Sequence, residues 1–522
     1  MALSIEEMAL FCKRKGLIFP NSEIYNGMSG FYDYGPLGVE IKNSIKQSWW
    51  KSFVQQRDDV VGIDGTIISS PQVWVASGHV GCFADVMVEC TKCKARVRGD
   101  HLIEESLKIK GEGLKAEDID KLVSENNIKC PSCKGDFGKA DSFNLMFQTF
   151  VGPNQNKESI AYLRPETAQL IFADFKSVCD TCRVKLPFGI AQVGKAFRNE
   201  ISPRDFLFRT REFEQMEIEF FIHPNDKSCR LLDKKALRFK FNVLTSKDQS
   251  KNNSHSVMSV KNMLAKKLFS EWHAYWLVQL YSWFIGLGVK PENLRLREHL
   301  KDELAHYSSA CFDIEYNFPF GWKEIHGCAD RGNFDLTQHK KCSGRNLEIF
   351  DEATKSKVLP CVIEPSQGVD RAFLAFLFDA YVDDKERGNV LLKLHPLLAP
   401  VKVAVFPLVN KEGLPELSKK VVDGLRKDFV VAYDQSGSVG RRYARNDEIG
   451  TPYCVTVDFD SLKDSSVTVR DRDTTKQVRV KIKSLSKIIG KLLSGKGKFE
   501  KCGKVVEKVV SEAPSEDVKE QQ

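Results

Sequence analysis

The chain has 522 residues, of which 42% are hydrophobic and 28% charged, and this composition is typical of a soluble globular protein with about three domains. It contains no apolar run of the roughly 18 residues that a membrane span needs, and residues 1–16 lack the pattern of a secretory signal. We therefore expect a cytoplasmic protein with no membrane partner. The net charge of +8 permits a nucleic-acid partner without requiring one.

The N-terminal part of the chain combines helical and strand patterns. A glycine- and aromatic-rich segment at 27–38 precedes a helix-period stretch at 39–57 and a strand-like run at 60–71. Residues 141–223 are again rich in strand patterns. These two parts are interrupted by a segment of different composition, at 90–140.

This interruption contains two cysteine pairs with the spacing of zinc-ribbon knuckles. The pairs are Cys90 with Cys93 and Cys130 with Cys133. We predict that they bind a structural Zn²⁺, with a helix at 114–125 filling the gap between the pairs. The alternative is four free thiols. A further pair, Cys179 and Cys182, has no matching partner pair, and we expect it to be a reduced pair in a loop.

Residues 194–221 predict two β-strands joined by a loop. Because alternate residues of a strand point the same way, one face of the second strand carries Arg211, Phe213, Gln215, Glu217 and Glu219. The opposite face carries Glu212, Glu214, Met216, Ile218 and Phe220. On the first strand, Gln192, Arg198 and Glu200 share a face. Such a floor suits a ligand with a phosphate, a purine and an ammonium group; the alternative is an amphipathic hairpin with solvated charges.

The next part of the chain is mainly helical in pattern, over 224–300, and strands return at 311–335 and 358–366. A helix is predicted at 368–382, with Arg371 in its first turn. A cation is disfavoured there by the helix dipole, but a bound anion would remove the objection, because helix N–H groups and a guanidinium can hold one phosphate together. The alternative is an arginine that extends into solvent.

A break at 395–400 precedes a separate α/β unit. Its first strand is predicted at 401–407, followed by a helix at 413–427 and further alternating strands and helices. The region 481–504 is rich in lysine and could add phosphate contacts or form a solvated helix and tail, and the last dozen residues should be disordered.

The sequence contains neither a GxxxxGK[ST] loop nor a GxGxxG motif, so a nucleotide would have to bind on a sheet through arginines. FRNE at 197–200 and REF at 211–213 resemble motif 2 of class II aminoacyl-tRNA synthetases, and GVDR at 368–371 resembles motif 3. The helix and strand that end at Pro71 resemble motif 1, which forms much of the dimer interface in that class.

Longer segments are similar to glycyl-tRNA synthetases of the single-chain dimeric type, and the resemblance runs from about residue 5 to 492. These segments are YDYGPLGVEIKN (32–43), LRPETAQ (163–169), AFRNEISPR (196–204), REFEQMEIEFF (211–221), VIEPSQGVDR (362–371) and NDEIGTPYCVTVDFD (446–460). The resemblance implies an α+β catalytic domain on a mainly antiparallel sheet, with a small inserted cysteine-rich module and a C-terminal α/β anticodon-binding domain.

The implied domains follow from these patterns. They are a class II catalytic domain (1–89 and 141–395), a zinc-ribbon-like insertion (90–140), a helical insertion (224–300), an anticodon-binding domain (400–492) and a lysine-rich to disordered tail (493–522). In the anticodon-binding domain the best-matched stretch contains Gly440, Arg441, Arg442, Arg445 and Asp447.

The resemblance also implies roles for single residues in binding ATP. Arg198, Arg371 and Glu324 are the expected catalytic residues: Arg198 on the α-phosphate and the glycine carboxylate, Arg371 on the γ-phosphate, and Glu324 as the ligand of Mg²⁺. Phe213 should stack on adenine. The full ATP set is Arg198, Asn199, Glu200, Phe208, Arg209, Thr210, Arg211, Glu212, Phe213, Glu324, Ile325, Gly368, Val369, Asp370 and Arg371.

A second implied set surrounds glycine, and its carboxylates should face the ammonium group. It comprises Arg98, Glu166, Phe213, Glu214, Gln215, Met216, Glu217, Glu364, Pro365, Ser366, Gln367 and Gly368. The implied reaction is formation of glycyl-adenylate from glycine and ATP, followed by transfer of glycine to the 3′ end of tRNA-Gly by a homodimer. The alternatives are a class IIa synthetase for another small amino acid, and a non-catalytic RNA-binding paralogue.

Overall fold

A computed structural model describes residues 3–109, 111, 113–304 and 308–506. The chain forms two compact units, Met1–Asp379 and Ala380–Gln522. The boundary therefore precedes the break that the sequence predicts at 395–400. The hairpin of β20 (Tyr381–Asp384) and β21 (Asn389–Leu392) belongs to the second unit, where Arg387 donates hydrogen bonds to the carbonyl oxygens of Arg472 and Asp473.

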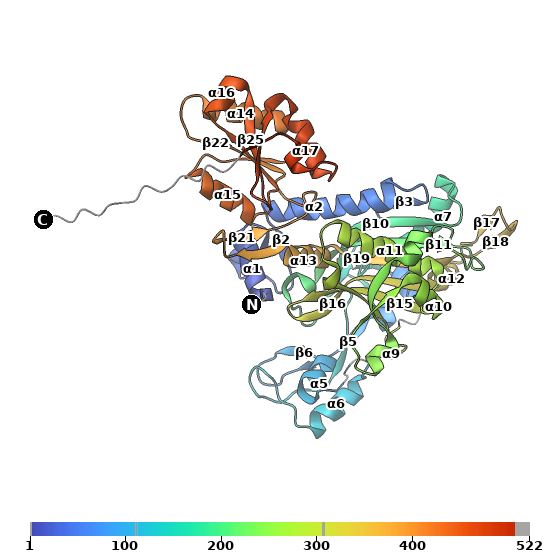
Figure 1. Cartoon of the computed structure of the whole chain (residues 1–522). Coiled ribbons are helices and arrows are strands. Elements are labelled where there is room, and N and C mark those ends of the chain that lie inside the picture. The colour runs from blue at the N-terminus through green and yellow to red at the C-terminus, as the bar shows by residue number, and fades with distance from the viewer. Residues whose placement is uncertain (1–2, 110, 112, 305–307, 507–522) are drawn as a thin grey trace. The chain divides into compact units, whose positions relative to one another are not determined.

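The first unit is built on a nine-stranded sheet with the order β13-β12-β14-β15-β16-β19-β11-β10-β3. Figure 1 shows its central strands side by side. Neighbouring strands are antiparallel except for β12 with β14 and β10 with β3, which confirms the mainly antiparallel fold. The strands are β3 Val60–Ile63, β10 Phe188–Phe197, β11 Glu212–Ile222, β12 Lys240–Leu244, β13 Ser256–Ser259, β14 Leu294–Glu298, β15 Ala310–Phe318, β16 Gly321–Gly332 and β19 Cys361–Gly368.

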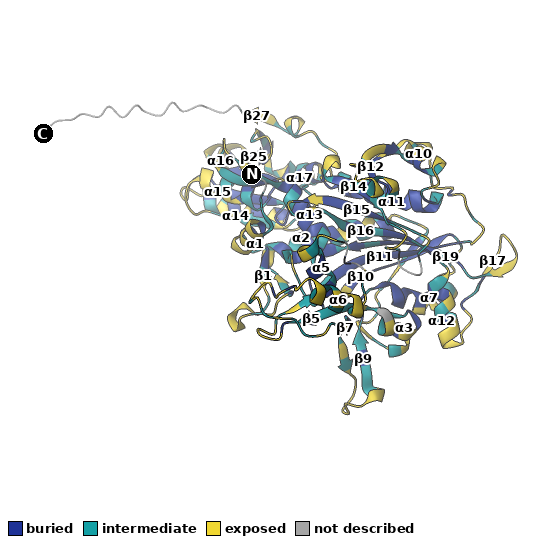
Figure 2. Ribbon diagram, turned by 90° about the horizontal axis from the view of Figure 1, so that it is seen from below, coloured by how far each residue is buried: buried dark blue, intermediate teal, exposed yellow. Residues whose placement is uncertain are grey.

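The central strands of this sheet are buried on both faces. Figure 2 shows β10, β11 and β19 mostly in dark blue, whereas the hairpin of β17 (Ile349–Asp351) and β18 (Ser356–Val358) is largely exposed. In the antiparallel register Gln192 lies opposite Glu217 and Ala196 lies opposite Phe213. The two faces of β11 are those that the alternation predicts. The alternative of an amphipathic hairpin with solvated charges is wrong, because Glu217 and Glu219 are buried.

Helices cover the two faces of the sheet in different ways. On the face of Met216 and Phe220 lies α11 (Glu271–Gly286), whose Trp276 ring centroid is 5.1 Å from that of Phe220. On the opposite face α7 (Ala168–Cys182) packs Phe175 against Phe221 at one end of β11 only. The remainder of that face is left for a ligand site, which opens toward the other end of β11.

The N-terminal helices flank this sheet. They are α1 (Ile5–Arg14), α2 (Pro36–Trp50), which continues into a π-helical turn at Lys51–Gln55, α3 (Pro71–Ala76) and α4 (His79–Cys82). Short strands β1 (Ile18–Pro20) and β2 (Tyr32–Tyr34) pair with each other, and β4 (Ile68–Ser69), β8 (Gln148–Phe150) and β9 (Ile160–Leu163) form a separate sheet. Helices α12 (Phe334–Ser343) and α13 (Val369–Ala380) follow β16 and β19.

The segment 224–300 differs from the predicted helical insertion. Besides α8 (Lys234–Arg238), α9 (Ser246–Ser250), α10 (Val260–Ala265) and α11, it supplies β12, β13 and β14. These three strands extend the main sheet past β15. The alternating apolar residues of such short strands are sparse, with Phe241, Val243 and Leu244 as the buried positions of β12, so helical periodicity dominates the sequence pattern.

The cysteine-rich module has its own sheet and core. Strands β5 (Ala84–Glu89), β6 (Arg96–Arg98) and β7 (Asp141–Asn144) form the sheet, so the module begins before the predicted residue 90 and ends after 140. Helices α5 (Gly99–Leu107) and α6 (Ala116–Glu125) pack on it, and α6 matches the predicted helix at 114–125. Val88, Ile103 and Ile119 are buried between them.

The second unit holds a six-stranded sheet in the order β23-β22-β24-β25-β26-β27. Its core joins Val403 and Val455 to Ile489. The elements are β22 Val403–Pro407, α14 Leu414–Leu425, β23 Val431–Tyr433, α15 Val439–Glu448, β24 Tyr453–Val457, α16 Phe459–Asp464, β25 Ser466–Asp471, β26 Gln477–Lys481, α17 Leu485–Leu493 and β27 Lys504–Val506.

The predicted tail from residue 493 differs from this structure, because β27 pairs with β26 at the sheet edge. The last dozen residues, which we expect to be disordered, lie outside the described residues. Among the helices that the structure describes, none is both long enough and apolar enough to cross a membrane.

Candidate active site

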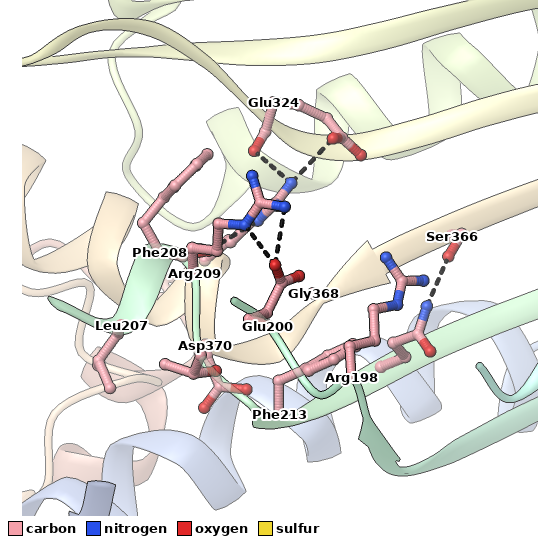
Figure 3. Close-up of a pocket in the computed structure, with 13 residues that line it drawn as sticks. Arg198, Glu200, Leu207, Phe208, Arg209, Phe213, Glu324, Ser366, Gly368 and Asp370 are labelled. Carbon is pink, nitrogen blue, oxygen red and sulfur yellow. Dashed lines mark hydrogen bonds and ion pairs between the residues drawn. The ribbon is translucent and has the colours of Figure 1, made fainter. Parts of the chain in front are cut away.

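A cavity of about 170 Å³ lies on the open end of the main sheet. Most of its lining comes from β11, the loop that precedes it, and the start of α13, and Figure 3 shows how these side chains face one another. The lining residues are Arg198, Glu200, Leu207, Phe208, Arg209, Thr210, Phe213, Gln215, Glu324, Ser366, Gly368, Asp370 and Arg371. Thus most of the predicted ATP set surrounds one cavity.

Arg198 and Phe213 lie together in this cavity. The Nε of Arg198 donates to the carbonyl oxygen of Pro165 at 3.0 Å, and its guanidinium carbon is 5.3 Å from the centroid of the Phe213 ring. The backbone hydrogen bond from Arg198 N–H to the Arg211 carbonyl (2.9 Å) continues the pairing of the two strands beyond β10. A guanidinium is therefore fixed beside an aromatic ring, which is an arrangement that can hold a phosphate next to a base.

A second arginine group links the cavity to the cysteine-rich module. Arg209 Nε donates to Glu200 Oε2 at 2.8 Å, and Arg209 Nη2 lies 3.9 Å from Asp85 Oδ2. Arg98 Nη1 contacts the same Asp85 oxygen at 2.6 Å and also binds Asp100. Arg98 does not line the cavity; it reaches the site through Asp85.

At the opposite side of the cavity Arg371 is held by Glu324. Its Nη1 donates to Glu324 Oε2 at 2.8 Å, and its guanidinium carbon lies 4.3 Å from the centroid of the Phe208 ring. Burial by itself would raise the pKa of Glu324, but the charge and hydrogen bond of Arg371 outweigh it and lower that pKa. Glu324 is thus an ionised carboxylate at the cavity, and the solvent-extended alternative for Arg371 is wrong.

Asp370 connects β11 to the start of α13. Its Oδ2 accepts the backbone N–H of Glu214 at 2.8 Å, and it also accepts a hydrogen bond from the hydroxyl of Tyr34. Glu214 itself forms ion pairs with Lys42 (2.8 Å) and Lys46 (2.9 Å) of α2. Glu214 therefore joins α2 to the sheet.

Several predicted site residues lie outside the cavity, and for most of them the cause is strand alternation. Arg211 is tied to the carbonyl oxygens of Glu200 and Ser29. Asn199 lies beyond the end of β10, and its N–H donates to the Leu145 carbonyl at 2.7 Å. The others alternate onto the far face or are buried in the core. None of these nine residues lines the cavity, so we leave them out of the proposed contact sets: Asn199, Arg211, Glu212, Glu214, Met216, Ile325, Pro365, Gln367 and Val369.

A cluster of buried carboxylates, called the carboxylate pocket below, lies next to the cavity on the same sheet face. Ser366 and Gln215 mark its entrance, with Gln215 Nε2 donating to Ser366 Oγ at 3.4 Å. Behind them Glu217 lies beside Ser366 in the register of β11 and β19, and Glu364 is the next residue on that face of β19. Glu166 acts electrostatically on both glutamates, so the structure brings the predicted ammonium-binding set together.

Three partners of this pocket were not predicted from the sequence. Arg331 on β16 donates to Glu364 Oε2 at 2.9 Å, Thr167 donates its hydroxyl hydrogen to Glu217, and His79 Nε2 lies 3.3 Å from Glu166 Oε2. Arg331 follows Glu324 on the same strand, in the segment WKEIHGCADR, so its sequence position offered a signal. The contact of His79 with Glu166 is long-range and offered none.

The pocket shifts the pKa values of its carboxyl groups in opposite directions. Burial would raise the pKa of Glu166, but the charge and hydrogen bond of His79 more than compensate and lower it. Burial and the neighbouring Glu166 charge raise the pKa of Glu217. Burial raises the pKa of Glu364 to about 8, although Arg331 opposes the shift. A cation that enters this pocket would relieve the repulsion between the carboxylates.

The four predicted metal-binding cysteines lie together in the inserted module, all within 4.8 Å of one another. Cys90 Sγ is 3.5 Å from Cys133 Sγ, and Cys93 Sγ is 3.7 Å from Cys130 Sγ. Four sulfurs bound to one Zn²⁺ at about 2.3 Å in a tetrahedron lie about 3.8 Å apart, so the geometry fits. The other pair, Cys179 and Cys182, lies in the last turn of α7 and not in a loop.

In the second unit α15 carries the best-matched anticodon-domain stretch. Arg442 is buried and donates to the carbonyl oxygens of Pro407 and Gly437, and Asp447 is buried in a bidentate pair with Arg470 at 2.8 and 2.9 Å. These two residues support the fold. Gly440, Arg441 and Arg445 are exposed, and Arg445 forms an ion pair with Asp434.

Comparisons with known proteins agree with both units. The family model described as Anticodon binding domain matches residues 402–492. Glycine–tRNA ligase of Caldanaerobacter subterraneus subsp. tengcongensis is 46% identical over 93% of this chain and 98% of its own length. That of Acetivibrio thermocellus is 48% identical over 92% and 97%, and that of Geobacillus kaustophilus is 46% identical over 93% and 98%.

Among solved structures, prolyl-tRNA synthetase of Cryptosporidium parvum, in complex with halofuginone and AMPPNP, aligns with a TM-score of 0.57 at 16% identity. The alignment covers 94% of this chain and 75% of that one, and it supports the class II synthetase fold. On the strength of these relatives, the chain belongs to the glycine–tRNA ligases, a family of class II aminoacyl-tRNA synthetases.

Proposed function

We propose that this chain activates glycine with ATP to form glycyl-adenylate and pyrophosphate, and then transfers glycine to the 3′ end of tRNA-Gly. One observation carries the proposal: a single sheet face holds a cavity with Arg198 and Phe213, and next to it lies the cluster of buried carboxylates. The first suits the nucleotide, the second the ammonium group. Glycine between them would present its carboxylate to the α-phosphate.

The chemistry needs positioning more than reactive side chains. The carboxylate of glycine is itself the nucleophile, so no protein nucleophile is required. In this assignment adenine stacks on Phe213, and Arg198 neutralises charge that develops on the α-phosphate oxygens. Arg198 is held by the Pro165 carbonyl, so its guanidinium is oriented before the substrates bind.

Arg371 is assigned to the γ-phosphate, and Glu324 to Mg²⁺. A second carboxylate is near: a Cβ built on Gly327 would lie 3.5 Å from Glu324 Oε1 and 3.7 Å from Asp313 Oδ1. Burial and the Glu324 charge raise the pKa of Asp313 to about 6. Two carboxylates that repel each other beside a phosphate site fit a divalent cation. Bound Mg²⁺ would supply charge neutralisation on the phosphates.

Selectivity for glycine follows from size and charge. Every competing amino acid is larger, so a tight pocket excludes rivals by steric overlap. An enzyme that must reject a substrate one methylene smaller gains only about 1–3 kcal/mol of discrimination from the lost contacts. Glu217 and Ser366 are neighbours across β11 and β19 and Glu364 follows on the same face, so the proposed ammonium site is small.

The remaining assignments concern assembly and metal. We propose a cytoplasmic homodimer, in which the motif 1-like α2 region forms the interface; the exposed apolar side chains of Ile24, Tyr25 and Met28 (86%, 79% and 59% exposed) support this. We also propose Zn²⁺ as the ion of the cysteine cluster. It would hold the two knuckles together and not take part in the reaction.

The decisive experiment is ATP–pyrophosphate exchange with each of the twenty amino acids. We expect glycine alone to support exchange. Exchange with serine, threonine or proline and not with glycine would contradict the specificity. A complete absence of exchange would favour the non-catalytic paralogue. The retention of Arg198 and Arg371 in the cavity argues against that last outcome.

A further inference from the structure

Glu219 is a buried carboxyl group on β11 that has no role in the ATP and glycine assignments made above. It lies on β11 between Phe221, which packs in the core under α7, and Glu217 of the carboxylate pocket. Its side chain is 0% exposed, and it pairs across the strands with the apolar Ile190. Neither of its oxygens has a hydrogen-bond partner among the described residues. A buried carboxyl group without partners requires a physical explanation.

The groups that face Glu219 are mostly acidic. One oxygen of each of Glu217, Glu219 and Glu364 lies within 4.8 Å of the other two. The nearby cation is Arg331, which directs Nη1 to Glu364 at 2.9 Å and the rest of its fork to Asp335 at 2.8 Å. Asp335 adds another carboxylate to the surroundings. Arg331 thus donates to Glu364 and Asp335, whereas Glu219 receives no hydrogen bond from the described residues.

We propose that Glu219 is a positioning residue that carries a proton and donates it in a hydrogen bond to Glu364. A neutral carboxyl is both donor and acceptor, so it can join two groups that would repel each other as ions. Glu364 then stays ionised on Arg331, and Glu217 remains free to receive the substrate ammonium. The inference rests on the proposed glycine site and adds to it the charge state of the pocket.

The energetics agree with this assignment. Burial and the charges of Glu364 and Glu217 raise the pKa of Glu219 well above its usual range, and Arg331 opposes this only in part. Glu364 competes for this proton, because burial raises its own pKa to about 8, but it has the contact with Arg331, and Glu217 has the Thr167 hydroxyl. Glu219 has neither, so the shared proton resides there.

The charge state has a consequence for selectivity. Three ionised carboxylates within 4.8 Å would form a site for a divalent cation. With one proton in place, the pocket needs only a single positive charge, and a primary ammonium supplies it together with hydrogen-bond donors. Protonated Glu219 thereby makes the pocket bind a singly charged amino group in preference to Mg²⁺, which is present in cells at millimolar concentration.

The test compares Glu219→Gln, Glu219→Ala and Glu217→Gln in glycine-dependent exchange. Gln is a neutral donor of nearly the same shape, so it should restore what Ala loses: we expect the glycine KM to rise ~10-fold in Glu219→Ala with little change in kcat, and less than ~3-fold in Glu219→Gln. A rise in Glu219→Gln as large as in Glu217→Gln would show an ionised Glu219 and overturn the proposal. Unchanged KM in both Glu219 variants would also overturn it.

Infrared difference spectroscopy on glycine binding provides a readout independent of rates. We expect a protonated-carboxyl band that shifts when glycine binds, persists in Glu217→Gln and is lost in Glu219→Gln. If the band remains in Glu219→Gln, the proton belongs to another residue and the proposal is wrong. ATP affinity, which depends on the cavity and not on Glu219, controls for folding. Failure of the wild-type protein to bind glycine would instead overturn the proposed function.

Discussion

Arg371 and Glu324 form a direct ion pair in the cavity lining, with Nη1 of the arginine 2.8 Å from Oε2 and 3.1 Å from the carbonyl oxygen of the glutamate. Arg371 lies in the first turn of α13 and Glu324 lies on β16, so this pair joins two elements that are distant in sequence. Each member has a further proposed task, since Arg371 would bind phosphate and Glu324 would bind Mg²⁺. Substrate binding would then exchange an internal ion pair for contacts with MgATP.

Glu324→Gln tests this exchange. The variant keeps a hydrogen-bond acceptor for Arg371 but loses the charge that attracts Mg²⁺, so we expect kcat to fall by about 100-fold and the Mg²⁺ concentration for half-maximal exchange to rise. Glycine affinity should change little, because the carboxylate pocket is separate. An unaltered Mg²⁺ dependence would remove Glu324 from the metal site. Asp313→Asn, measured in parallel, shows whether the second carboxylate takes part.

Glu217→Gln tests the amino-group pocket, and Glu214→Gln is its matched control on the same strand. The two side chains point to opposite faces of β11, so only the first should matter to glycine. We expect the glycine KM to rise about 30-fold or more in Glu217→Gln, equivalent to about 2 kcal/mol. Glu214→Gln should lower thermal stability and leave the glycine KM as it is. Equal effects on KM would contradict the assignment.

The cysteine cluster predicts about one zinc per chain by elemental analysis. Cys130→Ser should lose the metal and lower the melting temperature of the module, because Cys130 is buried at the centre of the cluster. Cys182→Ser, at the exposed end of α7, is the control and should keep full metal content. A stable, active preparation without metal would show that the four thiols hold the module without an ion.

Arg441→Ala tests the RNA face of α15. The side chain is exposed, so its removal should leave the unit folded and raise the KM for tRNA ~5-fold, while glycine-dependent exchange stays unchanged. Asp447→Ala has a different expected result. It breaks a buried bidentate pair with Arg470, and we expect loss of stability of about 3–5 kcal/mol. Denaturant unfolding and aminoacylation kinetics separate the two effects.

His273 predicts part of the acid sensitivity of the fold. Its Nε2 donates to the Cys328 carbonyl at 2.9 Å, and its Nδ1 has no partner among the described residues. Burial lowers its pKa to about 4, against an ordinary value of 6.5, so the folded state favours the neutral ring. That stability is complete above pH 6.5 and is lost as the pH falls toward 4.

Between pH 7 and pH 5, the low pKa of His273 should lower the free energy of unfolding by about 2 kcal/mol. His273→Gln can keep the hydrogen-bond donor to the carbonyl but has no group that titrates. The free energy of unfolding of this variant should therefore fall by about 2 kcal/mol less than that of the wild-type protein between pH 7 and pH 5. Denaturation curves at several pH values measure the difference. Parallel pH profiles for the two proteins would show that another group causes the acid sensitivity.

The sequence predicted those parts of the site that depend on local geometry. Alternation along β11 correctly separated Phe213, Gln215 and Glu217 from Glu214 and Met216. The glycine-binding set nevertheless included Glu214 and Met216, because they lie within the segment that resembles the family. For these two residues, strand alternation predicted the position of the side chain better than the resemblance did. Burial of both faces of a central strand cannot be read from alternation alone.

The missing parts are long-range or depend on weak local patterns. Glu219 faces Glu364, and Arg331 reaches Glu364 from another strand; neither pairing leaves a periodic signal. Within 224–300 the strands are only four or five residues long, so their propensity is overridden by the strong helical pattern of α11. Arg442 lies in the best-matched stretch of the anticodon-binding domain, yet the fold buries it.

Asp85 receives Arg98 from its own module at 2.6 Å and Arg209 from the cavity at 3.9 Å. Because Asp85 lies on the first strand of the cysteine-rich module, anything that loosens that module also releases Arg209 from one of its two anionic neighbours. The inserted module therefore contributes to the charge balance around Arg209, a residue of the cavity lining, although Asp85 itself is not among the lining residues.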